Sequence, residues 1–212
     1  YGDLNGQINA LDLGEERLHS LLDEYTEENI SNALKELRER AEKMMRQHIS
    51  ALPNETISVE DYLDNDGVTD KPLTLAIDLT IKDDKMIIDF SRSSNACDGP
   101  VNISKSTTIA ATYVALKHIF TDVPANAGVL KPVEFIIPED SFLNVRAPKP
   151  VGGYTETILR LIDVMFLAFQ NSASDKINGC AYGTINALSL SGYRKNGSRW
   201  VMFSFFGGGH GG

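Results

Sequence analysis

The chain has 212 residues, of which 42% are hydrophobic, so it is long enough to bury a core of one large domain or two small ones. Its formal net charge of −9, from 29 acidic and 20 basic residues, argues against nucleic acid or an anionic membrane as the main partner. Because no signal-like or membrane-spanning run is found and Cys97 and Cys180 lack metal-ligand spacing, we expect a reduced, cytoplasmic protein.

Two amphipathic helices are predicted for the first quarter of the chain. Apolar residues recur at helical spacing in the first, at Leu4, Ile8, Leu11, Leu18, Leu22 and Tyr25. Thr26 is a suitable N-cap for the second, whose apolar stripe continues as far as Pro53. We expect ion pairs on its exposed face, namely Glu36–Arg40, Glu39–Lys43 and Glu42–Arg46. These helices define a predicted helical arm over residues 1–56.

The pattern changes to strands and shorter helices over residues 57–212. Apolar residues alternate from Leu73 to Ile81, and a "KDDK" turn then leads to Met86, Ile88 and Phe90, which predicts a β-hairpin. We interpret "DNDG" at 64–67 as an Asx-rich turn rather than a calcium loop. Further elements follow, namely a helix at 104–120, a strand at 133–138, a helix at 154–170 and a last hairpin turning at Asn196-Gly197. This order predicts an α+β fold.

The stretch "CDGPVNISKST" at 97–107 places a Gly-Pro turn between a strand and a helix N-terminus, where backbone amides could hold an anion. The turn lacks the pattern of a nucleotide-binding loop. In the structural interpretation, Asp98 and Gly99 shape the turn while Asn102 and Ser104 cap the helix. In the functional one, Asn102 contacts a substrate.

The stretch "VGGYTETILRLID" at 151–163 is the best local candidate for a site. Gly152 and Gly153 lead directly into a helix start, and Glu156, Arg160 and Asp163 then lie on one face of an otherwise apolar helix. Buried charges need partners, so the three groups either neutralise one another as a structural network or line a cavity that a substrate completes. We name all three as candidate catalytic residues and the two glycines as candidate substrate contacts.

The four histidines, at positions 19, 48, 118 and 210, form no metal-binding motif, so no metal ligand is predicted in this chain. His210 differs from the others because it lies in the terminal sequence "SFFGGGHGG". Flanking glycines would allow its backbone to approach a ligand closely. We therefore include His210 among the candidate substrate-binding residues.

Several long phrases occur in a familiar order, namely "GDLNGQINALDLGEERLHSLLDEY", "IDFSRSSNACDGPVN", "DVPANAGVLKPVEFIIPEDSFLNVRAP", "VGGYTETILRLIDV" and "FGGGHGG". Together they resemble the hydantoinase B family, which includes N-methylhydantoinase B, 5-oxoprolinase and subunits related to acetone carboxylase. The resemblance covers essentially the whole chain. Members of that family are longer, so the chain is expected to be a central fragment truncated at both ends.

The resemblance implies part of an ATP-dependent hydrolase of cyclic amides. It implies a hydantoinase A-type partner that binds ATP, a small cyclic amide as substrate and an oligomeric assembly. A divalent metal is implied for some full-length members, with ligands upstream of the part matched here. Two alternatives stay open: a ketone carboxylase subunit of the same family, and an assembly module without activity when isolated.

Overall fold

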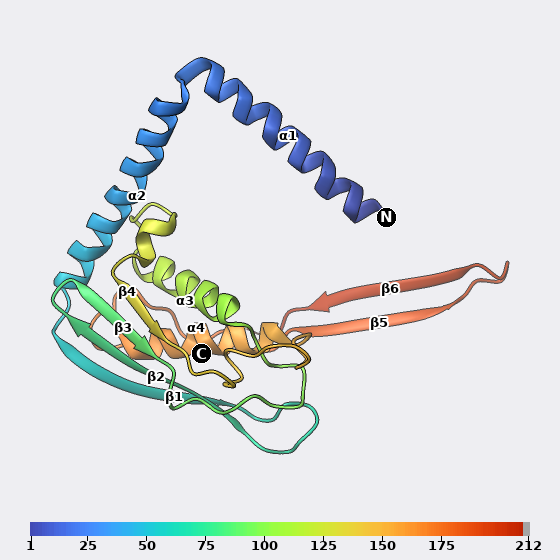
Figure 1. Cartoon of the computed structure of the whole chain (residues 1–212). Coiled ribbons are helices and arrows are strands. Elements are labelled where there is room, and N and C mark those ends of the chain that lie inside the picture. Colours follow the sequence, from blue (N-terminus) through green and yellow to red (C-terminus); the bar gives the residue numbers. More distant parts are fainter. Residues whose placement is uncertain (210–212) are drawn as a thin grey trace.

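The structure is a computed structural model that describes residues 1–209, and it has an α+β fold (Figure 1). Two long helices come first, α1 (Gly2–Tyr25) and α2 (Glu27–Ser50). Three strands follow, β1 (Glu55–Leu63), β2 (Leu73–Lys82) and β3 (Lys85–Asp89). The middle of the chain forms α3 (Lys105–Ile119), the 3-10 helix η1 (Ala127–Leu130) and β4 (Val133–Ile136). The last elements are α4 (Tyr154–Phe169), β5 (Asn186–Tyr193) and β6 (Arg199–Phe206). The predicted fold class is confirmed.

Strands β1 to β4 form one sheet in the order β1-β2-β3-β4. The first two pairings are antiparallel, with Val59 opposite Ile77 and Leu79 opposite Ile88. The pairing of β3 with β4 is parallel, because the chain crosses over through α3 and η1 between these strands. The alternating apolar residues of β2 are buried, so the predicted hairpin at residues 73–90 is confirmed.

Helices α3 and α4 cover one face of this sheet, and the core lies between the two layers (Figure 1). Helix α4 packs against β1 and β2, and α3 packs against α4. The largest side chains that are fully enclosed include Phe90, Phe142 and Phe169. Helix α2 adds Ala41, Met45 and Ile49 from its C-terminal half, and all three are buried. That half of α2 is therefore part of the core and fixes the direction in which the rest of the helix leaves the body.

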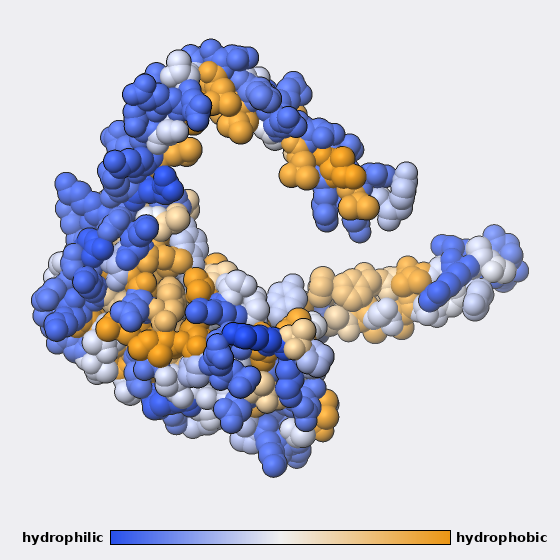
Figure 2. All heavy atoms as spheres, viewed as in Figure 1, coloured by the Kyte–Doolittle hydropathy of each residue, from blue (hydrophilic) through white to orange (hydrophobic). Residues whose placement is uncertain are grey.

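Two segments project from this body, namely α1 and the β5–β6 hairpin (Figure 1). Every residue of α1 is exposed or only partly buried, although its helix runs unbroken to the bend at Thr26, where φ is 64°. The side chain of Thr26 caps α2 by accepting a hydrogen bond from the Asn29 amide, as predicted. Apolar side chains gather along α1 and along the hairpin, whereas the tip of the hairpin is polar (Figure 2).

Strand β1 was not predicted from the sequence. Its inward positions alternate as Ile57, Val59, Asp61 and Leu63, so a carboxylate interrupts the apolar series. The predicted division between residues 56 and 57 falls inside this strand. Of the predicted ion pairs on α2, Glu42–Arg46 forms at 2.7 Å. Lys35 and Glu39, which were not predicted to pair, lie 3.8 Å apart. The pairs Glu36–Arg40 and Glu39–Lys43 are absent from the ion pairs of residues 1–209.

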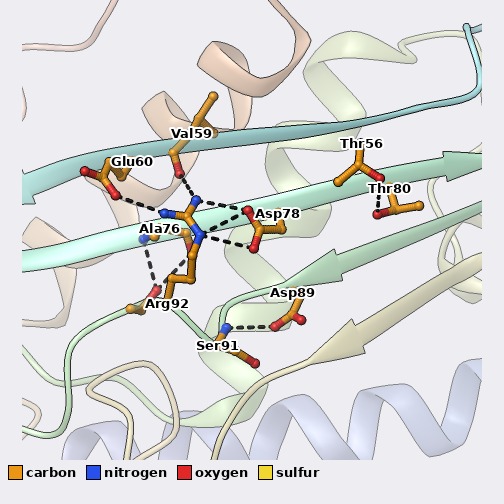
Figure 3. A network of polar contacts seen from close by, with 10 residues as sticks. Thr56, Val59, Glu60, Ala76, Asp78, Thr80, Asp89, Ser91 and Arg92 are labelled. Atoms are coloured by element: carbon orange, nitrogen blue, oxygen red, sulfur yellow. Dashed lines mark hydrogen bonds and ion pairs between the residues drawn. The ribbon is translucent and has the colours of Figure 1, made fainter.

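A polar network on the solvent side of the sheet joins β1 and β2 to the turn after β3 (Figure 3). Arg92 donates from Nε to both carboxylate oxygens of Asp78 at 3.1 Å, and from Nη1 to Glu60 at 3.0 Å. Its Nη2 also donates to the carbonyl oxygen of Val59. Because these groups are substantially exposed, solvent screening limits what the ion pairs contribute to stability. Arg92 therefore joins β1 and β2 to the turn after β3 at the surface of the sheet.

Candidate functional site

The polar face of α4 meets the end of β1, and this contact brings the three ionisable residues of the helix to one side of the body. Glu156, Arg160 and Asp163 share a face because they are spaced by four and three residues. Helix α4 is held against the sheet by its buried apolar residues, which include Leu161, Val164 and Met165. The charged groups therefore take fixed positions relative to the strand.

Asp61 on β1 is the main partner of Arg160. Arg160 Nη1 lies 2.6 Å from Asp61 Oδ2, whereas its distance from Asp163 Oδ2 is 3.9 Å. The Arg160 side chain is 27% exposed, so one part of the guanidinium reaches solvent while another part is enclosed. Its Nε is buried and has no hydrogen-bond partner within residues 1–209. Asp61 thus orients the arginine without using all of its donors.

Asp163 is a buried carboxylate with an incomplete set of partners. Its Oδ1 accepts a hydrogen bond from the Ala181 amide at 3.2 Å, while its Oδ2 is buried and accepts none from the described part of the chain. Burial raises the pKa of the Asp163 carboxyl, and the Ala181 amide and the Arg160 charge oppose that rise. Asp163 Oδ2 thus lies 3.9 Å from Arg160 Nη1, beyond hydrogen-bond distance.

The segment that precedes β5 is tied to the same face of α4. Glu156 Oε1 accepts from the Ile185 amide at 3.1 Å, and Asp163 holds the Ala181 amide. Between these two attachment points, Gly183 has a φ of 80°, a conformation that favours glycine. A β-carbon at Gly183 would also lie 3.5 Å from Arg160 Nη2. The carboxylates of α4 therefore position this segment as a strap over the arginine.

These groups surround a cleft of about 390 Å³. Glu156 and Arg160 line it from α4, Gly153 from the start of that helix, and Gly183 and Thr184 from the strap. The opposite wall comes from the turn after β1, including Asp66. The structure thus brings Arg160, Glu156 and Gly153 together at one cleft, whereas Asp163 does not line it, and the functional roles of these residues stay predictions. Sequence reasoning missed Asp61, the residue that holds Arg160 in place.

Asp66 is a buried carboxylate in the wall of the cleft, and both of its oxygens accept hydrogen bonds. It accepts hydrogen bonds from the backbone amides of Thr69, Val68 and Gly99, which together hold the pKa of the Asp66 carboxyl far below its usual range. A β-carbon on Gly99 would lie 1.7 Å from the Asp66 carbonyl oxygen, so this approach requires glycine. The predicted Asx turn at "DNDG" is confirmed.

The remaining candidate residues lie near the cleft or outside the described part. Asn102 is fully buried, and its amide nitrogen donates to the carbonyl oxygens of Cys97, Gly99 and Pro150 while its oxygen accepts from the Cys97 amide. These bonds shape the loop, so substrate contact by Asn102 stays a prediction. Gly153 donates its amide hydrogen to Pro100, whereas Gly152 is exposed. His210 lies outside the described residues.

Other hollows on the surface are larger, and the arginine that lines two of them is already paired. Two of about 670 and 690 Å³ adjoin Arg46, which binds Glu42 at 2.7 Å and Asp84 at 3.0 Å. Within residues 1–209, no group of three or more His, Cys, Asp or Glu side chains is arranged to hold a metal ion. Nor does any helix in that part have both the length and the hydropathy to cross a membrane. The cleft at Arg160 therefore remains the candidate site.

Comparison with known proteins identifies a family that this chain matches. A family model described as hydantoinase B/oxoprolinase matches residues 1–212. A protein of Methanocaldococcus jannaschii is 30% identical over 99% of this chain, which spans 36% of that protein. The 5-oxoprolinase 1 of Arabidopsis thaliana is 30% identical over 89% of this chain and 15% of its own length. The caprolactamase subunit beta of Pseudomonas jessenii is 25% identical over 94% of this chain and 35% of its own length.

The fold is also found in a solved structure. The crystal structure of the ATP-dependent caprolactamase from Pseudomonas jessenii matches with a TM-score of 0.80 at 23% identity, over 94% of this chain and 35% of that chain. At this identity the likeness concerns the fold alone. The chain thus spans about a third or less of the relatives and of the structure that it matches.

Proposed function

The chain belongs to the hydantoinase B/oxoprolinase family, and we propose that it is part of the B subunit of an ATP-dependent hydrolase of cyclic amides. The observation that carries this proposal is the family match, which extends over residues 1–212. Relatives named as subunits support a multi-subunit assembly. We assign the partner role to a hydantoinase A-type subunit, which binds ATP and activates the substrate.

The cleft at Arg160 forms part of the active-site wall in this proposal. Hydrolysis of a cyclic amide breaks the ring C–N bond and adds water, leaving a carboxylate and an amine. A guanidinium binds a carboxylate or a phosphorylated intermediate through paired hydrogen bonds, and these bonds strengthen as negative charge develops. Asp61 holds Arg160 at 2.6 Å for this task, while Glu156 and Asp163 set the orientation of the strap and the bound group.

Metal chemistry is not assigned to residues of this chain. Some full-length relatives are expected to use a divalent metal, but residues 1–209 do not bring together three or more side chains of the kind that bind one. The steps assigned here are therefore binding, orientation and charge stabilisation by Arg160 and its carboxylates.

The test is an assay of the enzyme assembled from a hydantoinase A-type subunit and the full-length B-type polypeptide that contains this chain. The assembly is incubated with 5-oxoproline, hydantoin or caprolactam, with ATP or without it, and the ring-opened product is measured by mass spectrometry. We expect one of these rings to be opened only when ATP and both subunits are present. Omission of this chain is the control, and it should abolish turnover.

Two results would contradict the proposal. Product formation from a ketone that requires bicarbonate would instead make the assembly a carboxylase. Binding of the A-type subunit without any ring opening, under conditions in which a known relative is active, would leave this chain as an assembly module. Both results are read from the same reaction mixtures, by supplying acetone with labelled bicarbonate and by size-exclusion chromatography.

A further inference from the structure

Arg160 lies between two carboxylates, and only one of them binds it. Its Nη1 donates to Asp61 Oδ2 at 2.6 Å, whereas Asp163 Oδ2 lies 3.9 Å from the same nitrogen. The Asp61 side chain is 36% exposed, while that of Asp163 is only 3% exposed. Water screens a buried charge less than an exposed one, so an ionised Asp163 would attract the guanidinium strongly from its present position.

Both side chains also have a hydrogen-bonding atom that is not in use. Asp163 Oδ2 and Arg160 Nε are buried, and neither has a partner within residues 1–209. Leaving such atoms unpaired is costly, so a second arrangement that pairs one of them competes with the first. A shift of the guanidinium by about 1 Å would bring Nη1 within hydrogen-bond distance of Asp163 Oδ2. Because this chain itself encloses both atoms, the second arrangement needs no protein from outside it.

The charge of Asp163 depends on its burial and on two charged neighbours. Burial has the largest effect and raises the pKa of the Asp163 carboxyl. The Ala181 amide and the charge of Arg160 oppose this rise in pKa, whereas the charge of Asp61 adds to it. Asp163 therefore loses its proton at a higher pH than an exposed aspartate does. The proton determines whether Arg160 is opposed by one carboxylate charge or by two.

The other elements around α4 bring few titratable groups near Asp163. Residues 177–185, which include the strap, contain no acidic or basic side chain, and their Cys180 and Tyr182 are exposed. The side chains that β2 buries are apolar, and α3 contributes His118, whose ring lies against a phenylalanine of α4. A change of charge at Asp163 therefore acts mainly on its two charged neighbours.

We propose that Asp163 is a positioning residue that competes with Asp61 for Arg160. Protonated Asp163 leaves the guanidinium with Asp61 at the cleft, and ionised Asp163 draws it away from the cleft. Ionised Asp163 also adds negative charge, which weakens the binding of a carboxylate or phosphorylated group there. The inference rests on the proposed function only in assigning Arg160 to the active-site wall. Turnover should therefore fall as pH rises through the native pKa of Asp163.

The position of Arg160 can be measured without an assay of activity. Phenylglyoxal reacts with accessible guanidinium groups, and mass spectrometry of the digested full-length B-type polypeptide gives the rate at each arginine. Asp163→Asn cannot ionise but keeps an oxygen for the Ala181 amide. At mildly alkaline pH, we expect Arg160 of this variant to react about threefold or more faster than in the unaltered polypeptide. Below the native pKa of Asp163, the two rates should agree.

Two comparisons make this result specific. Arg92 binds two carboxylates on the solvent side of the sheet, so its rate should be the same in both polypeptides. Asp61→Asn removes the competing partner, so at mildly alkaline pH Arg160 should react more slowly in this variant than in the unaltered polypeptide. Circular dichroism checks that each variant is folded. If the ratio of the Asp163→Asn rate to the unaltered rate does not change with pH, the proposal is wrong, because a loosened strap would act at every pH.

The activity of the assembled enzyme tests the consequence. We expect kcat/KM for ATP-dependent ring opening to fall by about threefold or more as pH rises through the native pKa of Asp163. The Asp163→Asn enzyme should lack this fall. Ring opening with the same pH profile in both enzymes would overturn the inference and leave the proposed function standing. An assembly that opens no ring would instead contradict the proposed function, and the phenylglyoxal rates would still decide whether Asp163 competes for Arg160.

Discussion

The pKa values of two buried carboxylates, Asp66 in the wall of the cleft and Asp163 on α4, are shifted in opposite directions by their surroundings. Asp66 is surrounded by backbone amide donors, which lower the pKa of its carboxyl. Asp163 has a single amide donor and an ion-pair distance of 3.9 Å to Arg160, so burial dominates and raises its pKa. Several amide donors make Asp66 a structural anion, whereas burial with a single amide donor lets Asp163 retain its proton more readily.

The raised pKa of Asp163 predicts a pH dependence of stability. The native state holds the Asp163 proton to a higher pH than the unfolded state, so this contribution is complete below the ordinary value of 3.8 and is lost as pH rises through the native pKa. Asp163→Asn removes the titration while keeping an oxygen for the Ala181 amide. We therefore expect the variant to gain stability relative to the unaltered chain as pH rises through that window. Urea unfolding at a series of pH values measures the difference, and a difference that is constant with pH would contradict this account.

Part of the site could be predicted from the sequence, and part could not. The grouping of Glu156, Arg160 and Asp163 follows from helix periodicity, because their spacing fixes a common face. The contact of Arg160 with Asp61 joins residues 99 positions apart, and a single sequence carries no direct signal of it. The one available signal was the carboxylate that interrupts the apolar series Ile57, Val59 and Leu63.

Helix α2 consists of two halves that differ in what they contact. Its C-terminal half buries Met45 and Ile49 in the core, whereas Leu34 and Leu37 in the N-terminal half are 55% and 51% exposed. Sequence periodicity predicted one continuous stripe, since both halves have apolar residues at helical spacing. Where that stripe passes from the core into solvent depends on the position of the sheet, which local pattern does not contain.

A pair of substitutions in α2 tests this division. Met45→Ala should lower the free energy of unfolding by about 2–5 kcal/mol, because it opens a cavity at a fully buried position. Leu34→Ala in the exposed half should change it by less than about 0.5 kcal/mol. Urea denaturation of both variants gives the comparison. Equal losses would mean that the N-terminal half is packed as well.

The strands and helices that were predicted are confirmed, and β1 is the strand that the sequence did not predict. Its outward residues are polar, as expected of a half-exposed strand, but the inward series includes Asp61. The carboxylate that hid the strand is the residue that orients Arg160. A functional side chain at an inward position weakened the local pattern, because the strand gave up apolar burial there for an ion pair.

Two segments with exposed apolar side chains project from a sheet-and-helix body (Figures 1 and 2). The body also has a cleft lined by charged residues. Residue pattern predicted the α+β class, and the resemblance to the hydantoinase B family came from long ordered motifs rather than from periodicity. The placement of α1 and the hairpin outside the body could not be predicted, because each has the apolar pattern of an element that is buried. Exposure of such surfaces indicates interaction with other protein.

The measurement that tests the central claim most directly compares two arginines in the assembled enzyme. Arg160 binds Asp61 at the cleft, and Arg92 binds Asp78 and Glu60 on the solvent side of the same sheet (Figure 3). Arg160→Lys keeps the charge but loses the planar fork, so we expect kcat for ATP-dependent ring opening to fall by about tenfold or more. Arg92→Lys should leave kcat unchanged, with unfolding curves that show both variants to be folded. Equal kcat values for the two variants would contradict the assignment of the cleft.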